Sequence, residues 1–339
     1  MRANLWLRTA SRVVVRVAQF RATEFFELEK RAKKIPWEQF GAAGHAEFHV
    51  TARKSRLYHS DAIAERLLSA LGPRPSAPSA LTAESREPKA ESQLFVVRVF
   101  RDEFTISADS SGELLHMRGY RQAVGKAPLR ETLAAALLLA AGWTGETPLI
   151  DPLCGSGTIP IEGALLARRM APGLRRRFAF QKWAGYEDVE WQTLVTHAET
   201  VALASSPVPI LGSDRDAGAI ESSKANAARA GVSDVVFSAG SVSAMTPGDH
   251  PGLIATNPPY GKRASKSSDV RNLYAQLGKV LRKRCAGWRF ALYSPESRLS
   301  QQIGLSLEEM FRTSNGGIRV AALTGRVPDP AEITEANGA

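Results

Sequence analysis

The chain has 339 residues, which is enough for two domains that each have a core. The hydrophobic fraction of 44% and the charged fraction of 23% are ordinary for globular proteins. The net charge of +10 is compatible with an anionic partner without establishing one. No apolar run approaches the roughly 20 residues of a membrane span. Cys154 and Cys285 match no metal-ligand spacing and favour a reducing cytosol.

The first part of the chain mixes short strands and helices. The expected strands are 13–17, 48–50, 94–100, 104–108 and 113–117, and the expected helices are 25–34 and 61–71. Residues 72–92 are rich in proline, serine and alanine, and they predict a flexible loop. The histidines of this part have no carboxylate or cysteine at ligand spacing, so we interpret them as ordinary surface or core residues.

The second part alternates strand and helix. The expected strands are 149–151, 208–213, 234–238, 253–256 and 289–293, and the expected helices are 158–170, 216–230 and 270–285. This alternation predicts a parallel sheet covered on both faces. Two further β-rich runs, 310–314 and 318–323, flank Gly316 and Gly317 and predict an antiparallel hairpin at the edge of the sheet. From residue 328 onward we expect a frayed tail.

A polar tetrapeptide follows the apolar run 253–256 and consists of Asn257, Pro258, Pro259 and Tyr260. A buried strand with such an end predicts a site at the carboxyl edge of the sheet, where open α/β sheets bind ligands. The prolines fix φ and remove N–H groups, so the carbonyls before them are free to accept hydrogen bonds. These acceptors suit a planar ring with an exocyclic amine, and Tyr260 offers a face for stacking. The alternative is a cis-proline turn with a surface tyrosine.

Residues 151–158, DPLCGSGT, join a buried strand to a helix. Gly155 and Gly157 allow the backbone to approach a ligand, and the helix N-terminus offers free N–H groups. A dinucleotide pattern fits poorly, because Pro160 replaces its third glycine. The acidic end of the next strand, Asp214, also comes 63 positions after Asp151, whereas a nicotinamide site needs about 20. A P-loop is excluded, since no Gly-Lys-Ser/Thr follows.

The remaining interpretation is a cofactor with an adenosine and no phosphate. Asp214 could accept hydrogen bonds from both ribose hydroxyls, and the glycine turn could pass under the amino-acid part. Asp151 could hold that turn or meet an ammonium group. Asp216 is expected to cap the next helix. Cys154 is expected to be a small buried residue, since no base is visible nearby to make it a nucleophile.

The segments DPLCGSGT, GSDRD and NPPYGKR occur in this order and resemble class I S-adenosylmethionine-dependent methyltransferases that modify exocyclic amines. With 3–17, 111–121 and 127–143, the chain resembles bacterial large-subunit ribosomal RNA guanine-N2 methyltransferases that carry an N-terminal THUMP RNA-binding domain. The resemblance covers 3–325.

The resemblance implies a seven-stranded Rossmann-like methyltransferase sheet behind an α+β THUMP/ferredoxin-like domain. The implied domains are 1–118, 119–327 and a disordered tail at 328–339. A cytoplasmic monomer that uses S-adenosylmethionine, binds RNA and needs no metal is then expected.

The implied site residues fall into two overlapping groups. The catalytic candidates are Asn257, Pro258, Pro259 and Tyr260. The cofactor-binding candidates are Asp151, Cys154, Gly155, Gly157, Thr158, Asp214, Ser241 and Asn257.

The chain departs from the family in three ways. Ser241 stands where the family often has an acidic residue for the adenine amine. The chain starts inside the usual ferredoxin-like domain, so we expect a shortened N-terminus. The second methyltransferase fused in some relatives is absent, so one activity is expected.

A basic and aromatic stretch predicts contacts with RNA phosphates. The candidates in this stretch are Arg175, Arg176 and Arg177, and Lys262 and Arg263, which follow the tetrapeptide, could meet flanking phosphates. A solvated basic surface is the alternative for each.

Four functions remain open from the sequence. The favoured one is methylation of guanine N2 in large-subunit ribosomal RNA. The others are a transfer-RNA-directed relative, a DNA amino-methyltransferase, and a non-catalytic RNA-binding or assembly protein.

Overall fold

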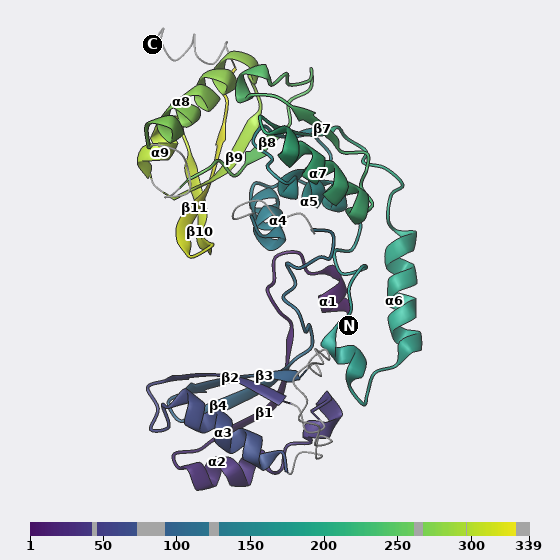
Figure 1. The fold of residues 1–339 in the computed structure, drawn as a ribbon, viewed down its shortest axis with the longest axis vertical. Coiled ribbons are helices and arrows are strands. Elements are labelled where there is room, and N and C mark those ends of the chain that lie inside the picture. The colour runs from purple at the N-terminus through teal and green to yellow at the C-terminus, as the bar shows by residue number, and fades with distance from the viewer. Residues whose placement is uncertain (43–45, 73–91, 122–128, 261–266, 296, 330–339) are drawn as a thin grey trace, which may run out of the picture. The chain divides into compact units, whose positions relative to one another are not determined.

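The structure is a computed structural model that describes residues 1–42, 46–72, 92–121, 129–260, 267–295 and 297–329. The chain forms two compact units (Figure 1). The first contains Met1–Leu115 and Arg176–Val195, and the second contains His116–Arg175 and Thr196–Ala339. The chain first passes from the first unit to the second after Leu115, three residues before the domain boundary expected after residue 118. Residues 176–195 then belong to the first unit again, whereas they were expected in the second domain.

The first unit contains a four-stranded sheet in the order β1-β4-β3-β2. The strands are β1 (Val14–Arg21), β2 (Ala46–Arg53), β3 (Gln93–Phe100) and β4 (Glu103–Asp109). β2 and β3 pair in parallel, and the other pairs are antiparallel. Its helices are α1 (Arg2–Trp6), α2 (Phe25–Ala32), α3 (Ser60–Ala70), η1 (Trp37–Phe40) and η2 (Ala179–Lys182). Figure 1 shows α2 and α3 on one face of this sheet.

Alternation of side chains builds the core of this unit. Phe95, Val97 and Val99 of β3 are buried, whereas Arg98 and Phe100 are exposed. The buried set packs with Leu28 of α2 and with Ile63 and Leu67 of α3. The core of this unit therefore forms between the buried face of β3 and the apolar faces of α2 and α3.

The expected strand at 113–117 is wrong. The backbone there bonds elsewhere, because the Leu115 N–H donates to the Ser11 carbonyl at 2.9 Å. The Arg176 guanidinium donates to the carbonyls of Glu113 at 2.7 Å and Leu114 at 2.9 Å. With these groups bonded to an N-terminal residue and to an arginine, no strand ladder forms.

The second unit contains a seven-stranded sheet in the order β10-β11-β9-β8-β5-β6-β7. The strands are β5 (Leu149–Asp151), β6 (Ile210–Asp214), β7 (Val236–Ala239), β8 (Leu253–Thr256), β9 (Arg289–Ser294), β10 (Glu308–Asn315) and β11 (Ile318–Arg326). β9, β8, β5, β6 and β7 pair in parallel, and β11 pairs antiparallel with β9 and β10. The expected seven-stranded sheet with an antiparallel edge hairpin is confirmed.

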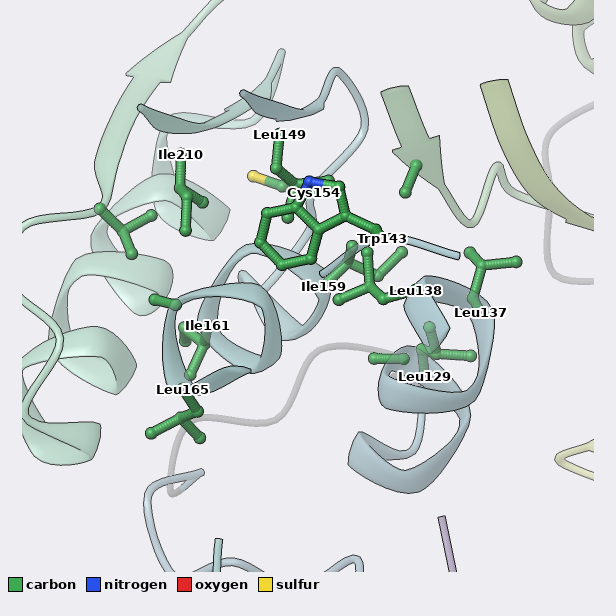
Figure 2. Close-up of a cluster of buried hydrophobic side chains, with 14 of the residues drawn as sticks. Leu129, Leu137, Leu138, Trp143, Leu149, Cys154, Ile159, Ile161, Leu165 and Ile210 are labelled. Atoms are coloured by element: carbon green, nitrogen blue, oxygen red, sulfur yellow. The ribbon is translucent and has the colours of Figure 1, made fainter. Parts of the chain in front are cut away.

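Helices cover both faces of this sheet. They are α4 (Glu131–Ala140), α5 (Thr158–Ala167), α7 (Ala217–Ala230), α8 (Ser267–Arg284) and α9 (Ser297–Gln301), with the short η3 (Val242–Ala244). α6 (Asp188–Thr200) begins in the first unit and ends in the second. Neighbouring strand residues enter different cores: Leu253 packs in the cluster of α4, α5 and α7, whereas Ile254 packs in that of α8. Figure 2 shows part of the first cluster, with the Trp143 ring beside Leu149 and with Leu138 beside Ile159.

Among the described residues, no helix is long and apolar enough to cross a membrane. The same part of the chain holds no group of three histidine, cysteine, aspartate or glutamate side chains that could bind a metal ion.

Candidate cofactor and substrate site

A cavity of about 650 Å³ lies in the second unit, at the carboxyl ends of β5, β6 and β8. Its wall contains eight of the residues that the sequence places in the site: Asp151, Cys154, Gly155, Thr158, Asp214, Ser241, Asn257 and Pro259. Gly157, Pro258 and Tyr260 are not part of this wall. Parallel strands share their carboxyl edge, so motifs 106 residues apart in the chain, Asp151 and Asn257, come together here.

The glycine turn passes close to the cavity because two of its residues adopt a left-handed backbone. Gly155 has φ +53°, and a Cβ there would enter open space. Gly157 has φ +82°, and a Cβ there would lie 3.0 Å from Phe237 and Ser223. Gly157 therefore holds the turn against α7 and β7, and Gly155 leaves room beside the cavity. α5 begins at the next residue, Thr158.

Asp214, the last residue of β6, stabilises this turn. Its Oδ2 accepts from the Gly155 N–H at 3.0 Å, and its Oδ1 accepts from the Asp216 N–H at 3.0 Å. Asp216 caps α7 by accepting from the N–H groups of Gly218 and Ala219, as expected. The two nearby carboxylates thus differ in their bonds: Asp216 caps a helix, and Asp214 lies at the cavity beside the glycine turn.

Asp151 connects the glycine turn to the tetrapeptide. Its Oδ1 accepts from the Thr256 hydroxyl at 2.7 Å and from the Leu153 N–H at 3.1 Å. Burial raises the pKa of Asp151 to about 7, against the effect of these hydrogen bonds, and the charge of Asp214 raises it further. The carboxyl group is therefore partly protonated near neutral pH and would be favoured in its charged form by a cationic ligand.

Asn257 follows Thr256 directly and has an unused acceptor. Its Oδ1 is buried and has no hydrogen-bond partner in the described part of the chain. An unpaired buried acceptor costs about 1–3 kcal/mol, so such an atom at a cavity indicates a ligand that donates to it. This atom fits the predicted exocyclic amine.

Tyr260 is half-buried, and its hydroxyl oxygen accepts from Asn315 Nδ2 of β10 at 2.8 Å. Burial raises the pKa of the Tyr260 hydroxyl. The ring is therefore held at its hydroxyl end by the edge hairpin. No cis peptide bond occurs among the described residues, so the alternative of a cis-proline turn is wrong.

Cys154 is buried, and burial raises the pKa of its thiol. A protonated thiol is a poor nucleophile, in agreement with the expectation of a packing residue. Ser241 lies in the cavity wall directly before η3, and its side chain makes no capping bond to that helix. Its contact with the adenine of the cofactor stays a prediction.

The three consecutive arginines occupy different environments. Arg176 is half-buried, donates to the backbone carbonyls of Ser111, Glu113 and Leu114, and lies 5.0 Å from the centre of the Phe178 ring. Arg175 is exposed and donates to the Arg229 carbonyl, and Arg177 is exposed. Arg176 has a structural role, and exposure leaves the other two accessible to phosphates. Lys262 and Arg263 lie outside the described residues.

Two polar residues that the sequence did not single out hold the glycine turn. Ser223 donates through its hydroxyl to the Gly155 carbonyl at 2.7 Å, and Asn226 donates through Nδ2 to the Ser156 carbonyl at 3.0 Å. Both lie on α7 and are fully buried. Their spacing of three residues on one helix face is the signal that could have indicated them.

The second unit has a mainly parallel seven-stranded sheet with an antiparallel edge hairpin. A glycine turn follows β5, and an aspartate ends β6. Together these features define an S-adenosylmethionine-dependent methyltransferase. Residues 118–322 match the family described as RMKL-like, methyltransferase domain (UPF0020). The chain belongs to this family.

Related proteins agree with this assignment. A ribosomal RNA large subunit methyltransferase K/L of Psychromonas ingrahamii is 35% identical over 339 residues, which cover 95% of this chain and 44% of the relative. A putative RNA methyltransferase of Synechocystis sp. is 33% identical over 322 residues, which cover 94% of this chain and 83% of the relative. The chain thus spans less than half the length of the K/L relative.

Solved structures share the fold over both units. A predicted N6-adenine-specific DNA methylase from Listeria monocytogenes is 32% identical, with a TM-score of 0.81, and the match covers 95% of this chain and 84% of that one. A putative methyltransferase complexed with SAH is 27% identical, with a TM-score of 0.80 and coverages of 97% and 86%.

S-adenosylmethionine is the cofactor, and the cavity fits its chemistry. Carboxylates at Asp151 and Asp214 suit a sulfonium, an ammonium and ribose hydroxyls. Open space beside Gly155 suits close passage of the ligand.

Proposed function

We propose that the protein transfers the methyl group of S-adenosylmethionine to the exocyclic N2 amine of a guanine in large-subunit ribosomal RNA. The observation that carries the proposal is the buried, unpaired Oδ1 of Asn257 in the wall of the cofactor cavity. An acceptor in that place matches the N–H of an exocyclic amine. The ribosomal target is supported by the relatives described as large-subunit ribosomal RNA methyltransferases.

The reaction needs a better nucleophile than the free amine, because the guanine N2 lone pair is delocalised into the ring. S-adenosylmethionine supplies an electrophilic methyl group when it is bound. Asn257 Oδ1 and the Pro258 carbonyl would accept the two amine N–H groups and shift the nitrogen toward a tetrahedral geometry. The N2 proton that the methyl group displaces would pass to water, so positioning and preorganised acceptors would account for the rate without a strong base.

Tyr260 would hold the target base by stacking, since the base must leave its stack or come from unpaired RNA. The bond from Asn315 to the Tyr260 hydroxyl limits rotation of the tyrosine side chain and prepares its face for the base.

The first unit is proposed to be the THUMP/ferredoxin-like RNA-binding domain. Its four-stranded sheet with helices on one face is compatible with that assignment. We also propose that the protein is cytoplasmic, because bacterial ribosomal RNA is found in the cytoplasm. We further propose that it acts as a monomer.

A DNA adenine methyltransferase is the second candidate, because one structure that resembles the chain is described as a predicted N6-adenine-specific DNA methylase. The amine-accepting tetrapeptide does not distinguish adenine from guanine. A transfer RNA target is the third candidate, with the same chemistry.

The test is deletion of the gene, followed by separate digestion and mass spectrometry of large-subunit RNA, transfer RNA and DNA. We expect loss of N2-methylguanosine from one large-subunit position and its return on complementation. Complementation with an Asn257→Ala variant should not restore it. Loss of a methylated base from transfer RNA or DNA instead would refute the ribosomal target, and no loss at all would refute the enzymatic proposal.

A further inference from the structure

A buried ion pair connects the segment before α4 to the cofactor cavity. Arg121 Nη2 lies 2.8 Å from Glu131 Oε2, and the two side chains are 12% and 4% exposed. The same Nη2 donates to the Leu129 carbonyl at 2.7 Å. Leu129 is 5% exposed and lines the cavity. One guanidinium therefore joins a residue of the cavity wall to the first residue of α4, and we refer to Arg121 and Glu131 as the arginine clasp.

The Leu129 carbonyl lies outside the hydrogen-bond ladder of α4. The first bonds of the helix, from the N–H groups of Leu133 and Ala134, go to the Arg130 carbonyl. The bond from Arg121 is the one that fixes the Leu129 carbonyl in the described part of the chain. Figure 2 shows the Leu129 side chain beside α4, in the cluster that also contains Ile159 of the cavity wall.

Stability alone is a weak reason for this arrangement. A buried ion pair loses hydration on both charges, and an apolar pair of similar volume often stabilises a fold as well or better. Burial raises the pKa of Glu131 to about 7 despite the neighbouring charge of Arg121. The specific consequence of the clasp is geometric, since it sets the position of Leu129.

The preceding residue, Tyr120, is connected to a second part of the cavity wall, at Ser156. Its carbonyl accepts from Arg229 Nε at 2.8 Å, and Arg229 Nη2 donates to Asn226 Oδ1. Asn226 in turn holds the carbonyl of Ser156 in the glycine turn. Two neighbouring residues of one segment are thus connected to two residues of the cavity wall, Arg121 directly to Leu129 and Tyr120 to Ser156 through Arg229 and Asn226.

We propose that Arg121 and Glu131 are positioning residues for the cofactor site: the arginine clasp fixes Leu129 in the cavity wall and thereby sets the affinity for S-adenosylmethionine. This inference concerns the cofactor and is independent of the RNA target.

A double-mutant cycle tests the inference with the full chain and S-adenosylhomocysteine, in the absence of RNA. We expect Arg121→Gln and Leu129→Ala each to weaken binding by about tenfold, the scale of a lost apolar contact in a pocket. The double variant should bind within about twofold of Leu129→Ala, because Arg121 acts through Leu129. Titration calorimetry measures the affinities, and thermal unfolding measures stability in parallel.

Glu162→Gln is the matched control. Glu162 is 1% exposed, accepts from the Tyr120 hydroxyl at 3.1 Å and lies 3.5 Å from Arg118 Nε, and it is not part of the cavity wall. It should lower the unfolding temperature and leave the affinity unchanged. If Arg121→Gln does not fold, Glu131→Gln takes its place in the cycle, because it keeps the size of the side chain.

Three results would overturn the inference. They are an affinity of the clasp variant within twofold of the wild type, additive losses in the double variant, and a loss in Glu162→Gln as large as that in the clasp variant.

Discussion

Replacement of Asp214 tests the cofactor site most directly. Asp214→Ala removes a carboxylate that we expect to accept from the ribose hydroxyls. A hydrogen bond to a charged group contributes about 1.5–3 kcal/mol, which corresponds to a loss of affinity of about 10- to 150-fold. The variant also loses the bonds to the N–H groups of Gly155 and Asp216, so we expect a lower unfolding temperature.

Asp216→Ala separates these two effects. Asp216 also lines the cavity, but its carboxylate is bonded to two N–H groups at the start of α7. Loss of such a cap costs about 0.5–2 kcal/mol of stability, so the unfolding temperature should fall while affinity is retained. Titration calorimetry with S-adenosylhomocysteine measures both variants.

An analogue that lacks the ribose hydroxyls completes the experiment. The wild type should bind this analogue as weakly as Asp214→Ala binds S-adenosylhomocysteine. Asp214→Ala should bind the analogue and S-adenosylhomocysteine with the same affinity. Binding by Asp214→Ala within twofold of the wild type would refute the ribose contact, and so would an equal loss of affinity in Asp216→Ala.

Four further predictions follow from the described contacts. Asn257→Ala should lower turnover about 10²–10³-fold with near-normal cofactor affinity in calorimetry, and activity within a few-fold of the wild type would contradict the role. Arg177→Ala should flatten the salt dependence of RNA binding by about 0.7 if it contacts a single-strand phosphate, and an unchanged slope would assign it to the solvated surface. Gly157→Ala should lower the unfolding temperature because of its φ of +82° and the 3.0 Å contacts of a Cβ, and unchanged stability would refute the strain. Because a bound cation lowers the raised pKa of Asp151, cofactor affinity should increase with pH up to about 7 and the increase should be absent in Asp151→Asn, as calorimetry across this range can show.

Local patterns predicted the elements that carry the site. The strands 149–151 and 253–256 were predicted with the observed bounds, because each is a short apolar run that ends at a polar residue. The cap at Asp216 was predicted for a similar reason, since its acceptor lies before a helical pattern. Such features depend on neighbours in the sequence.

Partners far apart in the sequence could not be predicted in this way. Arg175, Arg176 and Arg177 are identical in type and adjacent, yet Arg176 alone bonds to the carbonyls of Glu113 and Leu114. These hydrogen bonds fix the Arg176 side chain, and they also occupy carbonyls that the expected strand at 113–117 would need. No periodicity of charge or hydrophobicity contains this information.

The arginine clasp shows the same limit. Arg121 and Glu131 lie ten positions apart, and no local rule pairs a residue before a helix with the first residue of that helix. The segments that contain them are marked in the sequence only by their resemblance to known methyltransferases. Only the structure shows that the two side chains are largely buried and that Arg121 donates to the carbonyl of Leu129 in the cavity wall.

The charge of the cavity explains why this glycine turn selects its cofactor. A dinucleotide would bring a pyrophosphate to the start of α5, where it would meet carboxylates at Asp151 and Asp214. The charge of Asp214 already raises the pKa of Asp151, so an additional anion would increase the repulsion in a poorly solvated site. A sulfonium and an ammonium group reverse the sign of that interaction. Electrostatics thus disfavours a dinucleotide independently of the glycine spacing. The hydrogen bond from Thr256 to Asp151 joins this carboxyl group to the strand end that continues into Asn257, the proposed amine acceptor.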